Sequence, residues 1–118
     1  MNPGPDRVFV YGTLRRGQCN HHWLKGARFL GEHTTEPRFI LLDLGVFPGV
    51  MTGQGVVMGE VYAIDAPLLA RLDYLEDYPR EYTRERIDTP FGQAWIYLYR
   101  HAPVDAPVIG GGDWCRRD

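Results

Sequence analysis

Hydrophobic and polar residues alternate over several stretches of the chain, with the two-residue period that is typical of half-buried β-strands. The pattern predicts strands at residues 7–11, 28–30, 38–42, 56–64, 82–88 and 93–99. The last two flank the sequence Thr-Pro-Phe-Gly, which predicts a β-hairpin. In the final strand one face should carry Ala94, Ile96 and Leu98, and the other face Trp95, Tyr97 and Tyr99. Residues 45–51 contain two glycines and a proline, and we expect a looped connection there.

Residues 65–76 have a different period, that of an amphipathic helix. Asp65 suits the N-cap position, and Pro67 is tolerated in the first turn. The predicted buried stripe consists of four leucines, Leu68, Leu69, Leu72 and Leu75. A second, shorter helix is predicted over residues 21–25, with Asn20 as its N-cap and Gly26 after its end.

Glu76 occupies a position in the long helix where the pattern calls for a leucine. At about 100° per residue from Leu68, the leucines span an arc from about 340° to about 100°, and Glu76 falls near 80°. Asp73 and Asp77 fall near 140° and 180°, outside that arc. A carboxylate on a buried face needs a reason. It is either a general acid/base whose pKa is raised by desolvation or a structural acid paired with Arg84 or Arg71, unless the helix end departs from the ideal angle.

The succession of short strands with few helices predicts a mixed α+β fold, as a small curled sheet or β-barrel flanked by a few short helices. The length of 118 residues and the lack of repeats or linkers predict one domain, residues 1–118. Residues 101–118 are rich in Pro and Gly, and we expect this tail to run over the surface and dock on the domain through Trp114.

Composition and charge exclude several classes of function. Hydrophobic residues make up 44% and charged residues 24%, as in globular proteins, and a net charge of −2 with no basic cluster argues against a nucleic-acid partner. There is no apolar run of about 18 residues and no signal-peptide pattern, so we expect no membrane partner and a cytoplasmic protein. Cys19 and Cys115 lack a metal-binding spacing and are expected to be free thiols.

The sequence Tyr11-Gly-Thr-Leu-Arg15 follows directly on the first predicted strand. A glycine at a strand end that leads into successive backbone N–H groups can form an anion-binding nest. The spacing of a phosphate-binding P-loop is missing, so a carboxylate ligand fits better. The same pattern is also found in ordinary turns between a strand and the next element.

Other polar residues are weaker candidates. The adjacent His21 and His22 cannot share one helical face and have no third metal ligand at a suitable spacing. Thr13 would need a neighbouring base to act as a nucleophile. Asp73 and Glu76 resemble a carboxylate pair, but their helical angles differ. Tyr97 and Tyr99 form an aromatic face or line a pocket together with Tyr11.

Several motifs occur in an order that resembles the gamma-glutamylcyclotransferase-like family, most closely its small bacterial and gamma-glutamylamine cyclotransferase branch. They are Val8-Phe-Val-Tyr-Gly-Thr-Leu-Arg-Arg-Gly-Gln18, Asn20-His21, Gly59-Glu-Val-Tyr62, Leu72-Asp-Tyr-Leu-Glu-Asp-Tyr-Pro79, Tyr82, Arg84 and Gly112-Asp-Trp114. The resemblance covers nearly the whole chain, and the pairing of its Tyr-Gly-Thr-Leu-Arg and Leu-Glu-x-Tyr-Pro motifs is specific.

The resemblance implies a small mixed β-barrel with one cavity beside the first strand, and an enzyme that releases 5-oxoproline and a free amine from a gamma-glutamyl amide. It assigns the catalytic general acid/base to Glu76. Substrate binding would fall to Tyr11, Gly12, Thr13 and Leu14, through backbone amides, and to Tyr82. It implies no metal and no organic cofactor, a small gamma-glutamyl substrate as partner, and a monomer or weak dimer.

Two positions depart from the family motif. Asp77 replaces the usual glycine, and if this position requires a positive φ, Asp is among the few other residues that adopt it. Cys19 replaces a proline near the expected pocket mouth. Two alternatives remain open, a non-catalytic ligand-binding module of the same fold and a protein-interaction domain that uses the Trp114 tail and the Tyr97/Tyr99 face.

Overall fold

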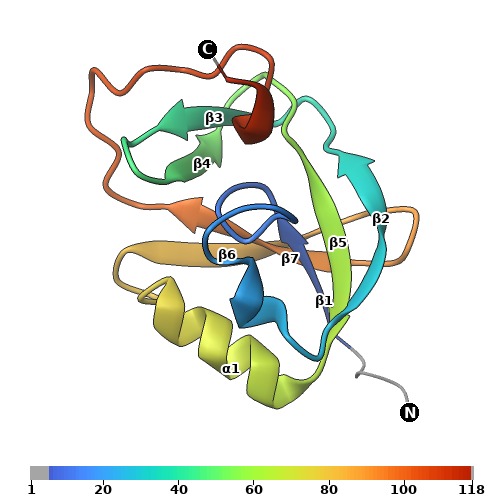
Figure 1. Ribbon diagram of the computed structural model, residues 1–118. Helices are drawn as coiled ribbons and strands as arrows, with labels where there is room; N and C mark the ends of the chain where they lie inside the picture. The colour runs from blue at the N-terminus through green and yellow to red at the C-terminus, as the bar shows by residue number, and fades with distance from the viewer. Residues whose placement is uncertain (1–5, 118) are drawn as a thin grey trace.

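The computed structural model describes residues 6–117, which form strands with one α-helix and two short 3₁₀ helices (Figure 1). The strands are β1 Asp6–Val10, β2 Arg28–Thr34, β3 Phe39–Asp43, β4 Pro48–Thr52, β5 Met58–Ile64, β6 Tyr82–Ile87 and β7 Ala94–Tyr99. The helices are η1 His21–Leu24, α1 Ala66–Leu75 and η2 Trp114–Arg116. The predicted α+β class is confirmed.

The main sheet has five strands in the order β2-β5-β1-β7-β6, and β3 and β4 form a separate two-stranded sheet. Strand β1 lies in the centre, antiparallel to β5 and parallel to β7. The predicted hairpin joins β6 to β7, with Tyr82 opposite Tyr99 and Ile87 opposite Ala94. The expected barrel is only an approximate description, because β2 and β6 are the two edges of a sheet that does not close within the described residues.

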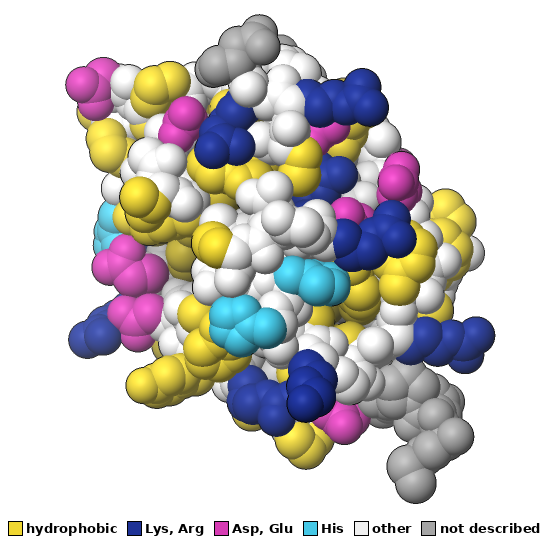
Figure 2. All heavy atoms as spheres, viewed as in Figure 1, with side chains coloured by type: hydrophobic (Ala, Val, Ile, Leu, Met, Phe, Trp, Pro, Cys, Tyr) yellow, Lys and Arg dark blue, Asp and Glu magenta, His cyan; other side chains and the backbone are white. Residues whose placement is uncertain are grey.

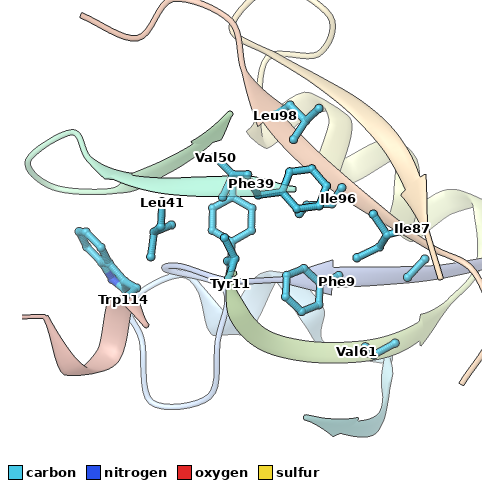
Figure 3. Packing of buried hydrophobic residues seen from close by; sticks show 12 residues of the cluster. Phe9, Tyr11, Phe39, Leu41, Val50, Val61, Ile87, Ile96, Leu98 and Trp114 are labelled. Atoms are coloured by element: carbon cyan, nitrogen blue, oxygen red, sulfur yellow. The ribbon is translucent and has the colours of Figure 1, made fainter. Parts of the chain in front are cut away.

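Each face of the main sheet packs against its own hydrophobic cluster, as the two-residue period of strands requires. Strands β3 and β4 cover one face, and α1 and η1 lie on the other (Figure 1). Figure 3 shows the first cluster, in which Phe9, Ile96 and Leu98 of the sheet meet Phe39 and Val50. The predicted alternation of β7 is confirmed, because Ala94, Ile96 and Leu98 join the first cluster while Trp95, Tyr97 and Tyr99 contact the second.

Helix α1 begins where the sequence predicts. The Asp65 side chain accepts a hydrogen bond from the Leu68 N–H at 2.9 Å, which is an N-cap. Leu68 and Leu72 are buried, and Glu76 is the C-cap. Asp77 follows with φ of 52°, so the positive φ considered for this position is present and an aspartate adopts it.

Strand β4 corrects the expectation of a loop over residues 45–51. Gly45 and its neighbours do form a turn, but Pro48 begins a strand that pairs with β3. A proline is tolerated at the first residue of a strand, where its missing N–H costs no ladder hydrogen bond. Strand β2 is also longer than predicted, because the pairing with β5 continues through a register shift between Phe29 and Gly31.

The C-terminal segment packs against the domain. The Ile109 N–H donates to the Leu41 carbonyl at 2.8 Å, and the Asp43 N–H donates to the Pro107 carbonyl at 2.8 Å, so this segment runs beside β3. Trp114 is 2% exposed and lies at one end of the first cluster, next to Leu41 (Figure 3).

Charged side chains are dispersed over the face seen in Figure 2, where Lys and Arg alternate with acidic and hydrophobic groups. This face carries no single basic patch of the kind that binds nucleic acid. No helix in residues 6–117 combines the length and the apolar character needed to cross a bilayer.

Candidate active site

A cavity of about 240 Å³ opens beside the end of β1. It brings together all six residues that the sequence analysis proposed for the site: Tyr11, Gly12, Thr13, Leu14, Glu76 and Tyr82. They come from three separate parts of the chain, namely the loop after β1, the end of α1 and the start of β6. Asn20, Phe47, Pro48 and Tyr97 also line the cavity.

The loop of residues 11–14 presents backbone N–H groups that the protein does not use. Within residues 6–117, the amides of Gly12, Thr13 and Leu14 donate to no backbone or side-chain acceptor. The carbonyls of the loop are engaged, because Thr13 O accepts from the Asn20 N–H at 2.9 Å and Leu14 O lies 2.9 Å from the His21 Nδ1. A loop held by its carbonyls with its amides unpaired is suited to bind an anion.

Asn20 fixes this loop in a second way. It stands at the N-cap position of η1, as predicted, but its side chain makes no capping hydrogen bond. Its Nδ2 donates instead to Thr13 Oγ1 at 3.0 Å. The Thr13 hydroxyl is therefore part of the loop structure, and no base contacts it within the described residues.

Gly12 lies against the ring of Pro48. A Cβ added at Gly12 would overlap the Pro48 Cγ and lie 2.8 Å from its Cδ. We expect Gly12→Ala to displace the loop at a cost of about 1–3 kcal/mol, and so to weaken ligand binding about tenfold or more. Isothermal titration with 5-oxoproline or glutamate measures this effect.

Gly110→Ala is the matched control for Gly12→Ala, because a Cβ at Gly110 meets no atom within 4 Å. This variant should bind both ligands as the unmodified protein does. Equal affinities for the Gly12→Ala and Gly110→Ala proteins would contradict a role of this loop in binding.

The Glu76 carboxyl faces the cavity without a protein partner. Among the described residues it takes part in no hydrogen bond and no ion pair. Arg84, which the sequence offered as a partner, binds Asp73 instead at 2.9 Å and 3.0 Å, and Arg71 is exposed. The hypothesis that Glu76 is a structural acid in a buried ion pair with Arg84 or Arg71 is therefore wrong.

Three tyrosines surround Glu76, but their hydroxyl groups donate elsewhere. Tyr11 donates to the Tyr97 carbonyl at 2.8 Å, Tyr82 to the Pro48 carbonyl at 2.9 Å, and Tyr97 to Asp73 Oδ1 at 2.7 Å. Glu76 is thus desolvated by protein without receiving a hydrogen bond from it, although part of its surface stays open to the cavity. Burial raises the pKa of Glu76 from 4.5 to about 7.

The raised pKa of Glu76 predicts a pH-dependent stability. Between pH 4.5 and 7 the folded protein retains a proton on Glu76 that the unfolded chain has lost, so the free energy of unfolding falls as pH rises through this window. Gln at this position cannot ionise. We therefore expect Glu76→Gln to become more stable than the unmodified protein as pH rises from 4.5 to 7, and the difference in free energy of unfolding should reach about 3 kcal/mol above pH 7.

Urea unfolding at several pH values measures this difference in free energy of unfolding. The two proteins should be closest in stability at pH 4, where the carboxyl is neutral in both the folded and the unfolded state. A stability difference that is constant from pH 4 to 8 would show that the Glu76 pKa is not raised.

Asp73 has partners that the sequence analysis did not predict. It does not line the cavity, as its helical angle predicts, but its carboxylate is only 22% exposed. It binds Arg84 through both oxygens and accepts the hydrogen bond of the cavity residue Tyr97. These partners come from β6 and β7, so no local signal in the helix sequence reveals them.

The remaining candidates divide between the cavity wall and the rest of the surface. Tyr97 lines it, but Tyr99 does not, and Tyr99 instead packs edge-on against Phe47 and Tyr82. Cys19 and Cys115 are both exposed and unpaired, as expected. Within residues 6–117, no three His, Cys, Asp or Glu side chains gather as a metal site would require.

Known proteins resemble this chain over nearly its whole length. A family model described as "Gamma-glutamyl cyclotransferase, AIG2-like" matches residues 8–116. The Escherichia coli protein named gamma-glutamylcyclotransferase family protein YtfP is 47% identical over 113 residues, which cover 95% of this chain and 98% of that protein. Its solution structure superposes with a TM-score of 0.78, at 44% identity, over 93% of this chain and 96% of that one.

A crystal structure of an AIG2-like protein from Mus musculus is also similar to this chain. It is 31% identical, with a TM-score of 0.79, and the match covers 89% of this chain and 86% of that one.

Proposed function

Because the chain belongs to the gamma-glutamyl cyclotransferase, AIG2-like family, we propose that it converts a γ-glutamyl amide into 5-oxoproline and a free amine. Glu76 is the general acid/base of this reaction. The observation that carries the proposal is the position, on the same cavity, of one carboxyl group and three backbone amides that have no hydrogen-bond partner within residues 6–117. The ring closure requires these two functions, a proton carrier and an anion-binding group.

The reaction is intramolecular. The α-amine of the substrate attacks the γ-carbonyl carbon, a C–N bond forms to close the five-membered ring, and the bond from that carbon to the leaving nitrogen breaks. Glu76 accepts a proton from the α-ammonium group, which frees the attacking lone pair, and returns it to the leaving nitrogen. The ring nitrogen loses a second proton once the C–N bond has formed, and the released amine takes up a proton to leave as an ammonium ion. No water molecule is consumed, and the atoms of the substrate are divided between 5-oxoproline and the amine.

A carboxyl group with a pKa of about 7 is suited to both proton transfers. Near neutral pH it exists as comparable amounts of acid and base, so neither form limits the reaction. The lack of a protein hydrogen bond to Glu76 leaves its oxygens available for the substrate nitrogen atoms. General acid/base catalysis of this kind typically contributes about 10²–10⁴-fold.

The loop of residues 11–14 holds the substrate in the conformation that closes. The amides of Gly12, Thr13 and Leu14 bind the α-carboxylate of the glutamyl group and anchor one end of a flexible chain. Once that end is fixed, the α-amine and the γ-carbonyl are confined near Glu76 and orientation lowers the barrier to ring closure. Tyr11 and Tyr82 form part of the aromatic wall of the cavity.

The direct test is incubation of the purified protein with a series of γ-glutamyl amines and γ-glutamyl dipeptides. Chromatography of the products should detect 5-oxoproline and the free amine in equal amounts. Tight binding of a γ-glutamyl compound without any release of 5-oxoproline across the series would favour a ligand-binding module of the same fold.

A further inference from the structure

The hydrogen bonds around Glu76 contain an arrangement that the proposed reaction does not by itself require. Tyr97 comes from β7 and lines the same cavity as Glu76, yet its hydroxyl donates to Asp73 Oδ1 at 2.7 Å. Asp73 lies three residues before Glu76 at the end of α1. Side chains with this spacing are neighbours, with Cβ atoms about 5–6 Å apart. Tyr97 and Glu76 also line the same cavity, and burial, Asp73 and the charge of Glu76 all raise the pKa of Tyr97, so this hydroxyl lies near Glu76 as well as Asp73.

Asp73 itself is held firmly in place. Arg84 Nε donates to Asp73 Oδ1 at 2.9 Å, and Arg84 Nη2 donates to Oδ2 at 3.0 Å. The guanidinium carbon also lies 4.5 Å from the centre of the Tyr78 ring and 4.2 Å from that of the Trp95 ring. Bidentate pairing and contact with two aromatic rings leave the pair little freedom to move.

We propose that Asp73 is a positioning residue, which accepts the hydrogen bond of the Tyr97 hydroxyl and so keeps that phenol from donating to Glu76. The catalytic importance of this hydrogen bond rests on the proposed function. In that reaction, Glu76 must be free to accept a proton and to return it. A carboxylate that received a phenol hydrogen bond would be stabilised in its ionised form and would be a weaker base.

The other groups that face Glu76 cannot produce this effect. The hydroxyls of Tyr11, on the β1 side, and of Tyr82, on β6, donate to backbone carbonyls, which side-chain substitutions leave in place. Asp77 lies beyond the end of α1 and pairs with the exposed Arg80 at 3.0 Å. Tyr97 is thus the one phenol in the described part of the cavity wall whose acceptor is a side chain.

The test measures the pKa of Glu76 directly, by following its side-chain carboxyl carbon with ¹³C NMR in a pH titration. The signal is assigned by its loss in Glu76→Gln. Tyr97→Phe should leave the pKa within about 0.3 of the unmodified value, because the missing hydroxyl never contacted Glu76. Asp73→Ala should lower the pKa by about one pH unit or more, because the hydroxyl of Tyr97 is released towards Glu76.

The double variant Asp73→Ala/Tyr97→Phe isolates the contribution of the hydroxyl. Loss of the Asp73 charge and exposure of Arg84 also lower the Glu76 pKa. These two effects are equal in Asp73→Ala and in the double variant, so the difference in pKa between the two proteins reports the Tyr97 hydroxyl alone. We expect the double variant to regain at least half of the decrease. A double variant with the same pKa as Asp73→Ala, or an Asp73→Ala protein with the unmodified pKa, would overturn the proposal.

Asp73→Asn provides a second comparison if Asp73→Ala folds poorly. Tyr97 and the Nε of Arg84 both bind Asp73 Oδ1, so an asparagine with its carbonyl oxygen in that place keeps these two hydrogen bonds while losing the charge and the hydrogen bond from Arg84 Nη2. Its Glu76 pKa should lie above that of Asp73→Ala, and an equal or lower value would count against the proposal.

The NMR measurement does not depend on turnover. A protein that shows the expected pKa changes but releases no 5-oxoproline refutes the proposed function and leaves the role of Asp73 towards Tyr97 intact. In the active enzyme, the acidic limb of the kcat profile of Asp73→Ala should move to lower pH together with the pKa of Glu76, and the limb should return towards its original position in the double variant.

Discussion

Replacing Glu76 by Gln is expected to lower kcat about 10²-fold or more while the affinity for 5-oxoproline stays nearly unchanged. Gln has the shape of Glu but cannot carry a proton from the α-ammonium group to the leaving nitrogen. The carboxyl has no hydrogen bond or ion pair within residues 6–117 that the substitution would break, so the fold should be retained. Release of 5-oxoproline gives kcat, and isothermal titration gives the affinity.

Asp77→Asn is the matched control for this substitution. Asp77 is the next residue in the chain, its ion pair with Arg80 lies on the surface, and Asn also tolerates the φ of 52° at this position. Its kcat should stay within about twofold of the unmodified enzyme. Asp73, the other acid of the helix, is not a suitable control because it binds the hydroxyl of Tyr97. Full activity of Glu76→Gln would assign the proton transfers to another group.

Replacing Trp114 by Ala is expected to lower the free energy of unfolding by about 3–5 kcal/mol. The indole is 2% exposed and fills one end of the first cluster. It also donates from Nε1 to Gln18 Oε1 at 3.3 Å, and the guanidinium of Arg117 stacks on it at 3.4 Å from the ring centre. Urea unfolding followed by circular dichroism measures the loss without relying on tryptophan fluorescence.

Val104→Ala is the control for Trp114→Ala within the same tail. Val104 is fully exposed, so its truncation should change the free energy of unfolding by less than about 0.5 kcal/mol. If Trp114→Ala were as stable as Val104→Ala, the tail would contribute nothing to the core.

The Glu76 helix and the loop of residues 11–14 were within reach of sequence analysis because each signal is local. The bounds of the helix follow from Asp65, the spacing of the leucines and Pro79. Because these bounds are known to within a residue, the direction of the Glu76 side chain follows from the helical period. The loop signal is similarly contained in Tyr11-Gly-Thr-Leu. Periodicity alone could not predict that the loop and Glu76 lie on one cavity, and that prediction came from the family motifs.

The parts that were missed depend on contacts between distant segments. The sequence around Pro48 reads as a turn, and it becomes a strand only because β3 is present to pair with it. Asp73 has its partners at Arg84 and Tyr97, on two other elements. A helical wheel gives the direction of a side chain relative to its own helix, but it cannot predict which strands will pack there.

The same limit applies to the closure of the sheet. Alternation identifies strands, but it carries no information on whether the first and last of them meet. Here β2 and β6 stay apart as the two edges, so the family resemblance suggested a more closed barrel than the structure contains.

The central place of β1 has a consequence for how the chain acquires its fold. The first strand to be synthesised pairs with β5 and with β7, and the parallel partner β7 is the last strand to leave the ribosome (Figure 1). The main sheet therefore cannot be completed until almost the whole chain is available. Because most of its pairings join distant residues, folding is expected on the millisecond-to-second timescale rather than in microseconds. Until β7 has been synthesised, the hydrophobic strand β1 has one unpaired edge, and we expect the chain to be most prone to aggregation during this interval.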